Sequence, residues 1–266
     1  MNKEQIIIFS NSYSPRTGHN FGSEVLKVFT NHEVLAHNRS ETKLSNLLEK
    51  YYEIYNTLAH KTDKEFFDKI VLKQIRTSII NESNSKYIMI KNTSFSGVFA
   101  LPKVFPNDIH IIILRNPVDV FSSIFKSMNL NKKGYKNTIK KIGKFLGIYP
   151  YYYCRKAGNK IIRLTPNLNH FYVIKYEDLV LQKESVLEDL KQKFNTQKSI
   201  EQIKKEINNI NVINTSFFEE TGTKHIWEAK EKTKNFNPIN RKKHSFFVQK
   251  GIEFGSKKLA KKLKYI

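Results

Sequence analysis

The chain has 266 residues, a formal net charge of +22 and 39% hydrophobic residues. This length and hydrophobic content indicate one folded domain with a sizeable core and exclude a disordered protein. The single cysteine, Cys154, excludes an internal disulfide framework, and no apolar run approaches the ~20 residues that a membrane span needs. We therefore expect a soluble, cytoplasmic protein. The charge would suit an anionic cofactor or acceptor, nucleic acid, a peripheral position at the inner membrane surface, or a solvated surface without functional meaning.

The N-terminal part of the chain alternates apolar strands with helical patterns. Ile6–Phe9 is an apolar run typical of a buried strand, and a polar, Ser-rich loop follows it. Beyond this loop, Phe21, Val25 and Leu26 recur at helical spacing. The pattern predicts a strand at 6–9, a loop at 10–18, a helix at about 20–30, a strand at 33–36, helices at 41–58 and 62–80, a strand at 86–91 and a helix around 98–104.

The next part begins with the most informative stretch of the sequence, 110–126. Ile111 to Leu114 form the apolar run of an inner parallel strand, and Pro117 suits the first turn of a helix, where its missing N–H costs nothing. The pattern predicts a strand at 110–114, a helix at 117–127, helices and loops over 128–165, a strand at 171–175, helices at 183–194 and 199–208, weak periodicity over 209–250 and a basic helix at 251–263.

The alternation of strands and helices predicts an α/β fold, a mostly parallel β-sheet with helices on both faces. We expect a single domain spanning residues 1–266. Within it, 128–165 is a candidate acceptor-side helical region and 209–266 is a basic C-terminal region.

Arg115 follows the 110–114 strand directly. It would lie at the carboxyl end of that strand, which is where open α/β sheets bind ligands. A guanidinium offers a rigid fork for a phosphate, and Ser123, two turns into the following helix, could add a hydroxyl donor. This junction favours a nucleotide-dependent transferase.

A second junction of this kind is Ser14-Pro-Arg-Thr-Gly-His-Asn-Phe21, between the first strand and its helix. Gly18 allows a tight turn, the free N–H groups of the helix start face the loop, and Arg16 adds a positive charge. The loop lacks the Gly-x-x-x-x-Gly-Lys-Ser/Thr pattern of P-loop kinases. An ordinary strand–helix turn that holds an Arg and a Gly would look the same.

Together these segments resemble the motifs of sulfotransferases that use 3′-phosphoadenosine-5′-phosphosulfate (PAPS). Pro15-Arg-Thr-Gly18 resembles that family's 5′-phosphosulfate loop, and Arg115-Asn-Pro-Val-Asp119 with Ser123 resembles its 3′-phosphate motif. Tyr176-Glu-Asp-Leu179, after a strand, resembles the third landmark. The three motifs stand in the family's order and span about residues 5–195.

The resemblance implies a P-loop NTPase-like sulfotransferase fold and an enzyme that transfers a sulfuryl group from PAPS to an acceptor hydroxyl, with 3′-phosphoadenosine-5′-phosphate (PAP) as the second product and no metal. The acceptor would be a saccharide or glycan, or another hydroxyl compound, and no nucleic acid is expected. The net charge of +22 favours an anionic or membrane-borne acceptor. Arg16 would stabilise charge on the leaving phosphate, by analogy with phosphoryl transfer. The residues implied for donor binding are Arg16, Thr17, Gly18, His19, Asn20, Phe21, Arg115, Ser123, Tyr176, Arg241 and Lys242.

Two features of the first loop depart from the family's pattern. His19 and Asn20 stand where the family usually has hydroxyl side chains, although both can donate hydrogen bonds. The stretch from Phe9 to Pro15 is also longer than usual.

The general base has two candidates, Glu41 and His37. Counting residues from the loop favours His37, whereas matching the residue type favours Glu41. Glu41 could instead complement the start of a helix at Ser40-Glu41, and His37 could be a surface loop residue.

Several basic segments keep more than one interpretation. Lys91, at the end of a strand, could bind a substrate or be solvated. Arg241-Lys-Lys-His244 resembles the family's late basic loop over the 3′-phosphate, with Lys250-Gly251 as a rival and solvated surface as the simpler interpretation. The aromatic stretch 131–155 could line an acceptor channel or pack helices. The helix that contains Lys257–Lys264 could contact a membrane surface or dock on the domain.

Three other functions compete with the sulfotransferase hypothesis. A P-loop kinase-like phosphotransferase would need a Walker lysine and an acidic metal ligand. A non-catalytic nucleic-acid-binding or polyanion-binding protein would leave the Arg115 and Tyr176 motifs unexplained. A degenerate sulfotransferase would bind nucleotide without turnover.

Overall fold

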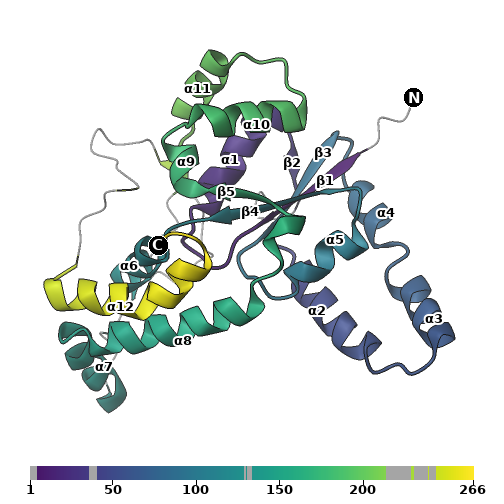
Figure 1. Ribbon diagram of the computed structural model, residues 1–266. Helices are drawn as coiled ribbons and strands as arrows, with labels where there is room; N and C mark the ends of the chain where they lie inside the picture. Colours follow the sequence, from purple (N-terminus) through teal and green to yellow (C-terminus); the bar gives the residue numbers. More distant parts are fainter. Residues whose placement is uncertain are drawn as a thin grey trace.

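The computed structural model describes residues 5–35, 41–128, 130, 134–213, 229–230, 239 and 244–266. Its centre is a parallel sheet of five strands in the order β2-β3-β1-β4-β5 (Figure 1). The strands are β1 (Ile6–Asn11), β2 (Glu33–Val34), β3 (Tyr87–Asn92), β4 (Ile109–Leu114) and β5 (Tyr172–Lys175). A separate antiparallel pair joins β6 (Val212–Ile213) to β7 (Ala229–Lys230). The predicted α/β class with a mostly parallel sheet is therefore confirmed.

Helices connect the strands and cover both faces of the sheet. Those that precede β4 are α1 (His19–Thr30), α2 (Leu44–Tyr55), α3 (Lys61–Val71), α4 (Ile75–Ile80) and α5 (Leu101–Val104). Those that follow it are α6 (Pro117–Ser127), α7 (Tyr135–Phe145), α8 (Ile148–Leu164), α9 (Tyr176–Val180), α10 (Glu184–Phe194), α11 (Ile200–Asn208) and α12 (Phe246–Lys262). Short 3₁₀ turns occur at Val98–Ala100 and Leu168–His170. No helix among the described residues is long and apolar enough to cross a membrane.

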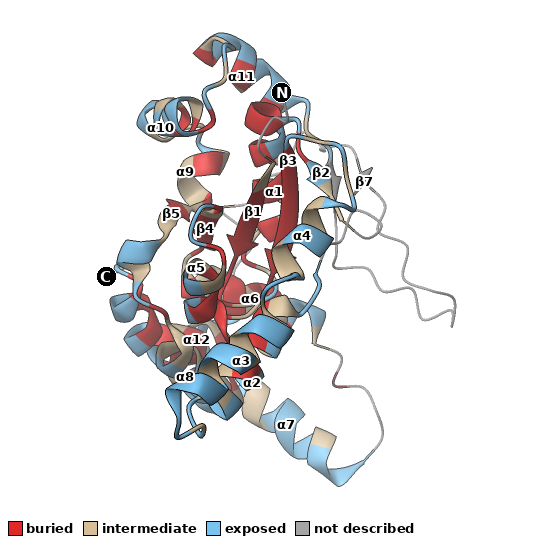
Figure 2. Cartoon of the chain, turned by 90° about the vertical axis from the view of Figure 1, so that its right-hand side faces the viewer, coloured by how far each residue is buried: buried red, intermediate tan, exposed pale blue. Residues whose placement is uncertain are grey.

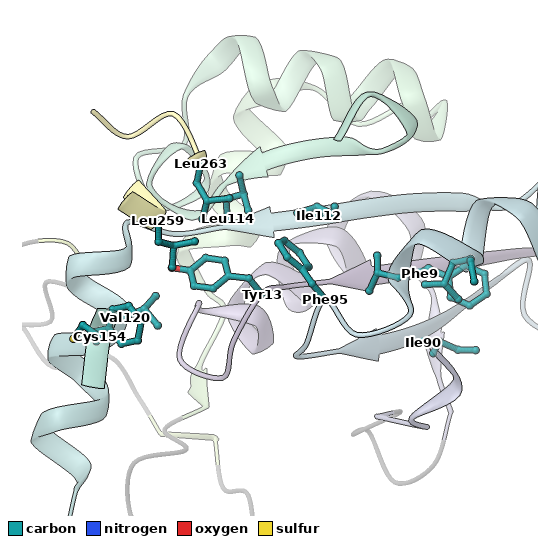
Figure 3. Close-up of a cluster of buried hydrophobic side chains, with 14 of the residues drawn as sticks. Phe9, Tyr13, Ile90, Phe95, Ile112, Leu114, Val120, Cys154, Leu259 and Leu263 are labelled. Atoms are coloured by element: carbon teal, nitrogen blue, oxygen red, sulfur yellow. The ribbon is translucent and has the colours of Figure 1, made fainter. Parts of the chain in front are cut away.

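The core forms two layers because successive side chains of a strand point to opposite faces of the sheet. Ile111 and Ile113 of β4 belong to one buried cluster, with α1, α9, α10 and α11. Ile112 and Leu114 belong to the other cluster, with α2, α5, α6, α8 and α12 (Figure 3). The inner strands β1, β3 and β4 are buried between these layers (Figure 2), as expected for a parallel sheet covered on both sides.

Some predicted boundaries are wrong, each for a packing reason. The helix expected at 62–80 is divided into α3 and α4. Ile75 and Ile79 of α4 pack on the core, whereas α3 has no buried residue. The last helix begins at Phe246 rather than at 251, because its exposed Phe246-Phe247 start carries no apolar periodicity.

The second half of α12 docks on the domain. Leu259, Ala260 and Leu263, which form the apolar side of the Lys257–Lys264 run, are buried, while Lys257 and Lys258 are exposed. The docked-helix interpretation of this run is confirmed, and this part of α12 has no apolar face left for a membrane.

Candidate functional site

The first loop is short because β1 is longer than the sequence suggested. β1 continues to Asn11, so only Ser12–Ser14 separate the strand from Pro15. The expected loop start at Ser10 was wrong, and the apparent extra length lies within the strand. Asn11 is buried, and its side-chain amide donates to the Ile111 carbonyl at 3.2 Å, which fixes the strand end against β4.

The turn into α1 uses left-handed backbone at two positions, Arg16 with φ 75° and Gly18 with φ 82°. The hydroxyl of Thr17 donates to the Ser14 carbonyl at 3.1 Å and closes the turn. The first helical hydrogen bond runs from the Gly22 N–H to the Gly18 carbonyl at 3.0 Å, and Gly18 has no side chain to cap the helix. The first-turn amides of α1 therefore lie at an end of the helix suited to an anion.

Tyr176 joins the first and third motifs. It is buried at the start of α9, directly after β5. A Cβ on Gly18 would lie 2.0 Å from Cε2 of Tyr176, so only glycine fits there. The ring of Phe21 meets that of Tyr176 edge-on, with 5.9 Å between the centroids. The turn at Gly18 and the tyrosine are therefore one packed unit.

Arg115 brings the second motif to the same place. Its side chain is only 3% exposed, and its guanidinium carbon lies 4.5 Å from the Tyr176 ring centroid. Nη1 of Arg115 donates to the Arg16 carbonyl at 3.1 Å. The structure thus gathers at the carboxyl ends of β1, β4 and β5 the three motifs that the sequence analysis singled out.

The junction between β4 and α6 is held by polar contacts that the sequence analysis missed. The Tyr13 hydroxyl donates to the Arg115 carbonyl at 2.6 Å, and burial raises the pKa of Tyr13 well above its usual value. Glu177 accepts from the Asn116 N–H at 2.8 Å and from the Tyr265 hydroxyl at 2.9 Å. The only sequence signals were the position of Tyr13 in the loop and that of Glu177 beside Tyr176.

Ser123 is buried two turns into α6, whose N-terminus is capped by Asn116 accepting from the Val118 N–H at 3.0 Å. The chain returns to this helix at His244, whose Nε2–H donates to the Ser122 carbonyl at 2.9 Å. The residue directly after Arg241-Lys-Lys thus lies beside the neighbour of Ser123. Arg241 and Lys242 themselves lie outside the described residues, as does His37.

The imidazole of His19 faces the sheet. It is buried, and its Nε2 lies 2.8 Å from the Ser10 carbonyl, to which it donates. Burial, with a smaller effect of Lys91, lowers the pKa of His19 to about 3, so the ring is neutral. The backbone N–H of His19 is at the helix start together with the half-buried Asn20.

Lys91 and Glu41 form the other side of the strand ends. Lys91 is buried on β3 beside Ser10, so its interpretation as a solvated residue is wrong. Burial lowers the pKa of Lys91, against the opposing effect of Glu24 and Glu41. Glu41 does not start a helix, because its backbone forms a β-bridge with Lys91 and α2 begins only at Leu44.

A cavity of about 530 Å³ lies at the C-terminal end of α6, one turn beyond Ser123. Lysines and His244 line it. Burial lowers the pKa of His244, and Lys126 and Lys144 lower it further. Its lining residues are Lys126, Ser127, Met128, Leu130, Lys141, Lys144, Phe145, His244, Ser245 and Val248. The chemistry of this wall suits an anion with an apolar part.

The aromatic stretch 131–155 had two interpretations, an acceptor channel and helix packing, and two of its tyrosines pack between helices. Tyr149 and Tyr153 of α8 meet the ring of Phe125 edge-on, with centroids 5.9 and 5.3 Å apart. Tyr152 is exposed. Helix packing therefore explains Tyr149 and Tyr153.

Comparison with known protein families gives a match that includes the residues of this site. A family model described as "Sulfotransferase family" matches residues 16–199, more than half of the chain. The matched region begins at Arg16 and includes Arg115, Ser123 and Tyr176. A search among curated proteins gives no match.

Proposed function

The chain belongs to the sulfotransferase family, and from this premise we propose that it transfers the sulfuryl group of PAPS to a hydroxyl of a saccharide or glycan. Family membership makes it a transferase and favours this function over the kinase-like and nucleic-acid-binding alternatives. The donor, the acceptor and the residue roles below are proposals.

The observation that carries the donor proposal is the buried Arg115 guanidinium at the carboxyl end of β4. It is held between the Tyr176 ring and the Arg16 carbonyl, so its orientation is fixed before any ligand arrives. A fixed guanidinium fork is suited to a phosphate dianion. We assign the 3′-phosphate of PAPS to Arg115 and Ser123, with Arg241 and Lys242 closing over it.

The loop after β1 would hold the 5′ end of the donor. The backbone N–H groups from Thr17 to Asn20 and the positive end of α1 are suited to a phosphate. When bound, the donor supplies an activated sulfuryl group and a stable phosphate leaving group. Arg16 would stabilise the negative charge that develops on that phosphate.

We assign different roles to the two aromatic residues Tyr176 and Phe21. Tyr176 is buried against Gly18, Phe21 and Arg115, so we assign it the positioning of Arg115 in addition to an adenine contact. Phe21 is half-buried and has more ring surface left for an adenine.

Glu41 and His37 stay the two candidates for the base that accepts the proton of the acceptor hydroxyl. Glu41 is supported by its bridge to Lys91 at the strand ends, next to β1. His19 is unsuited to this role because it is buried, its Nε2 is bonded to Ser10, and a pKa lowered to about 3 makes it a weak base. A Glu41→Gln variant should lose most of kcat while binding PAP normally, and His37→Gln should do so if the histidine is the base. The pH profiles of kcat for both variants decide between them.

The acceptor would lie toward residues 128–165. The lysine-lined cavity at the end of α6 adds local positive charge to a chain of net charge +22, which supports an anionic or membrane-borne acceptor. The protein would act at the cytoplasmic side of a membrane or in the cytoplasm.

The decisive experiment is calorimetric titration with PAP, AMP and ATP. We expect a clear preference for PAP, reduced about 10- to 100-fold in Arg115→Ala, because a charged hydrogen-bonded contact is lost. Arg115→Lys should recover little, since a lysine lacks the fork. Arg155→Ala is the matched control: Arg155 also lies over a tyrosine ring, that of Tyr151, but is exposed on α8. Equal binding of PAP and AMP would overturn the donor proposal.

A further inference from the structure

Helix α7 exposes a complete apolar stripe. Tyr135, Ile139, Ile142 and Leu146 recur at the spacing of one helix face, and they are 79%, 50%, 58% and 49% exposed. None of the residues in Tyr135–Phe145 is buried. An amphipathic helix of a globular protein normally turns such a stripe toward the core. In α7, Lys144 lies opposite the stripe and its ammonium donates to the Phe125 carbonyl at 3.0 Å, while Gly143, on a flank, approaches Tyr149.

All the charged residues of α7 are basic. The helix contains Lys136, Lys140, Lys141 and Lys144 and no acidic residue. On a helical wheel, Lys136 and Lys141 lie on opposite flanks of the apolar stripe. Helix α3 provides a contrast, since it also exposes large apolar residues but carries Asp63, Glu65 and Asp68 among its lysines.

Aromatic side chains extend this surface onto the start of α12. Phe246 and Phe247 are both exposed, as is Phe145 at the end of α7. A Cβ on Gly147, in the turn between α7 and α8, would lie 2.2 Å from the Phe247 carbonyl oxygen, so this turn lies directly against the start of α12. Both helix ends lie at the part of the molecule farthest from β2 and β3 (Figure 1), and Figure 2 shows α7 projecting from the body with mostly exposed residues.

We propose that this surface, made of α7, the α7–α8 turn and the Phe246-Phe247 start of α12, docks on an anionic phospholipid membrane. The apolar stripe would enter the boundary between headgroups and acyl chains, the aromatic rings would lie at the headgroup level, and the lysines would reach lipid phosphates. This inference does not rest on the sulfuryl-transfer proposal.

The charge pattern favours a membrane over the other occupants. A second copy of the chain would bring its own lysines against those of α7, in a molecule of net charge +22. Nucleic acid would pair with the lysines but leave Ile139 and Ile142 in water. An anionic bilayer satisfies both the lysines and the apolar stripe.

The test is co-sedimentation with vesicles of phosphatidylcholine, with and without phosphatidylglycerol. We expect binding that requires phosphatidylglycerol, and a loss of at least about tenfold in affinity in Ile139→Ser/Ile142→Ser. Phe66→Ser/Ile70→Ser on α3 is the matched control and should bind like the unchanged protein, because those side chains are 63% and 60% exposed but lie outside this surface. Lys140→Glu/Lys141→Glu should lose more affinity than Lys257→Glu/Lys258→Glu, which removes the same charge from α12.

Three results would overturn the proposal. The first is absence of binding to the anionic vesicles, and the second is an equal loss in the α7 variants and their controls. The third is a dimer of the unchanged protein in light scattering that Ile139→Ser/Ile142→Ser abolishes, or a lower Tm in this variant. A change of that kind would show that another copy or the chain itself covers the stripe.

Discussion

Tyr176 is the residue on which the proposed donor site is built. It contacts Gly18 from the first motif and Arg115 from the second, although these residues are far apart in the sequence. Because the ring fills the space beside Gly18, the turn, the ring and the guanidinium can only be placed together. A substitution at Gly18 should therefore also displace Arg115.

We expect Gly18→Ala to lower the free energy of unfolding by about 2–4 kcal/mol, from left-handed backbone and from overpacking against Tyr176. It should also weaken PAP binding, because the displaced ring no longer holds Arg115. Urea unfolding and calorimetry measure the two effects. Gly134→Ala is the control: Gly134 also has positive φ, but an added Cβ meets no atom within 4 Å. Normal PAP affinity in Gly18→Ala would contradict the coupling.

At this scale the sequence predicted the residues whose chemistry is local. Gly18 and Arg115 could be singled out because a strand–helix junction has characteristic requirements for them. Tyr13 and Glu177 could not, because their roles depend on hydrogen bonds to Arg115 and Tyr265 across long sequence separations. The orientation of His19 was not predicted either, because its bond to Ser10, which turns the side chain toward the sheet, depends on how the loop folds.

Among the elements, the pair α8–α12 depends on small residues at its contact. A Cβ on Gly255 would lie 2.5 Å from the Tyr151 carbonyl oxygen and 2.9 Å from the Cys154 Cβ. A Cβ on Gly158 would lie 3.4 Å from the Leu259 Cβ, an ordinary contact. The two glycines thus occupy the same interface with different amounts of space.

Gly255→Ala should therefore destabilise the protein by about 1–3 kcal/mol, since backbone must move to admit the methyl group. Gly158→Ala should be neutral or stabilising by up to about 1 kcal/mol, because alanine favours the helix. Urea unfolding of both variants measures the difference. Equal effects would mean that the two helices adjust their separation freely.

Helices and strands could be predicted from the sequence where the spacing of their apolar residues follows the buried face. The run Ile111–Leu114 and the helix after Pro117 were correctly located, since both are buried against neighbours. The division between α3 and α4 and the start of α12 at Phe246 were not predicted, because exposed apolar residues blur the pattern there. The bridge of Glu41 to Lys91 is a tertiary contact that local sequence does not encode.

The whole molecule has buried histidines that burial keeps neutral. Burial lowers the pKa of His19 from 6.5 to about 3 and that of His32 from 6.5 to about 4. It also lowers the pKa of His110, which stacks on Phe9 with 5.2 Å between the ring centroids. Each of these residues lies against the central sheet or α1, so their protonation opposes the folded state as a whole.

Acid should therefore destabilise the protein. Above pH 6.5 the histidines are neutral in both states; below it the unfolded chain takes up protons that the folded chain refuses until about pH 4 for His32 and about pH 3 for His19. The free energy of unfolding should fall by about 1.4 kcal/mol per pH unit for each such histidine.

Urea unfolding across this pH range measures the slope. In His19→Gln, where the amide can still donate to Ser10, the slope should be smaller by the contribution of one histidine, about 1.4 kcal/mol per pH unit. NMR of the unchanged protein provides a second measurement, since the His19 ring should not titrate above about pH 4. A His19 resonance that titrates near pH 6.5 would contradict the burial argument.

The strand order has a consequence for how the chain is made. β1 pairs with β3 and β4, so Ile6 meets Tyr87 and Ile8 meets Ile109. During synthesis from the N-terminal side, this apolar central strand emerges long before either of its neighbours exists. It stays unpaired while the ribosome makes α1 to α4, and such a segment is prone to aggregation in the meantime. The central strand of the finished sheet is therefore the one that most needs protection by chaperones during synthesis.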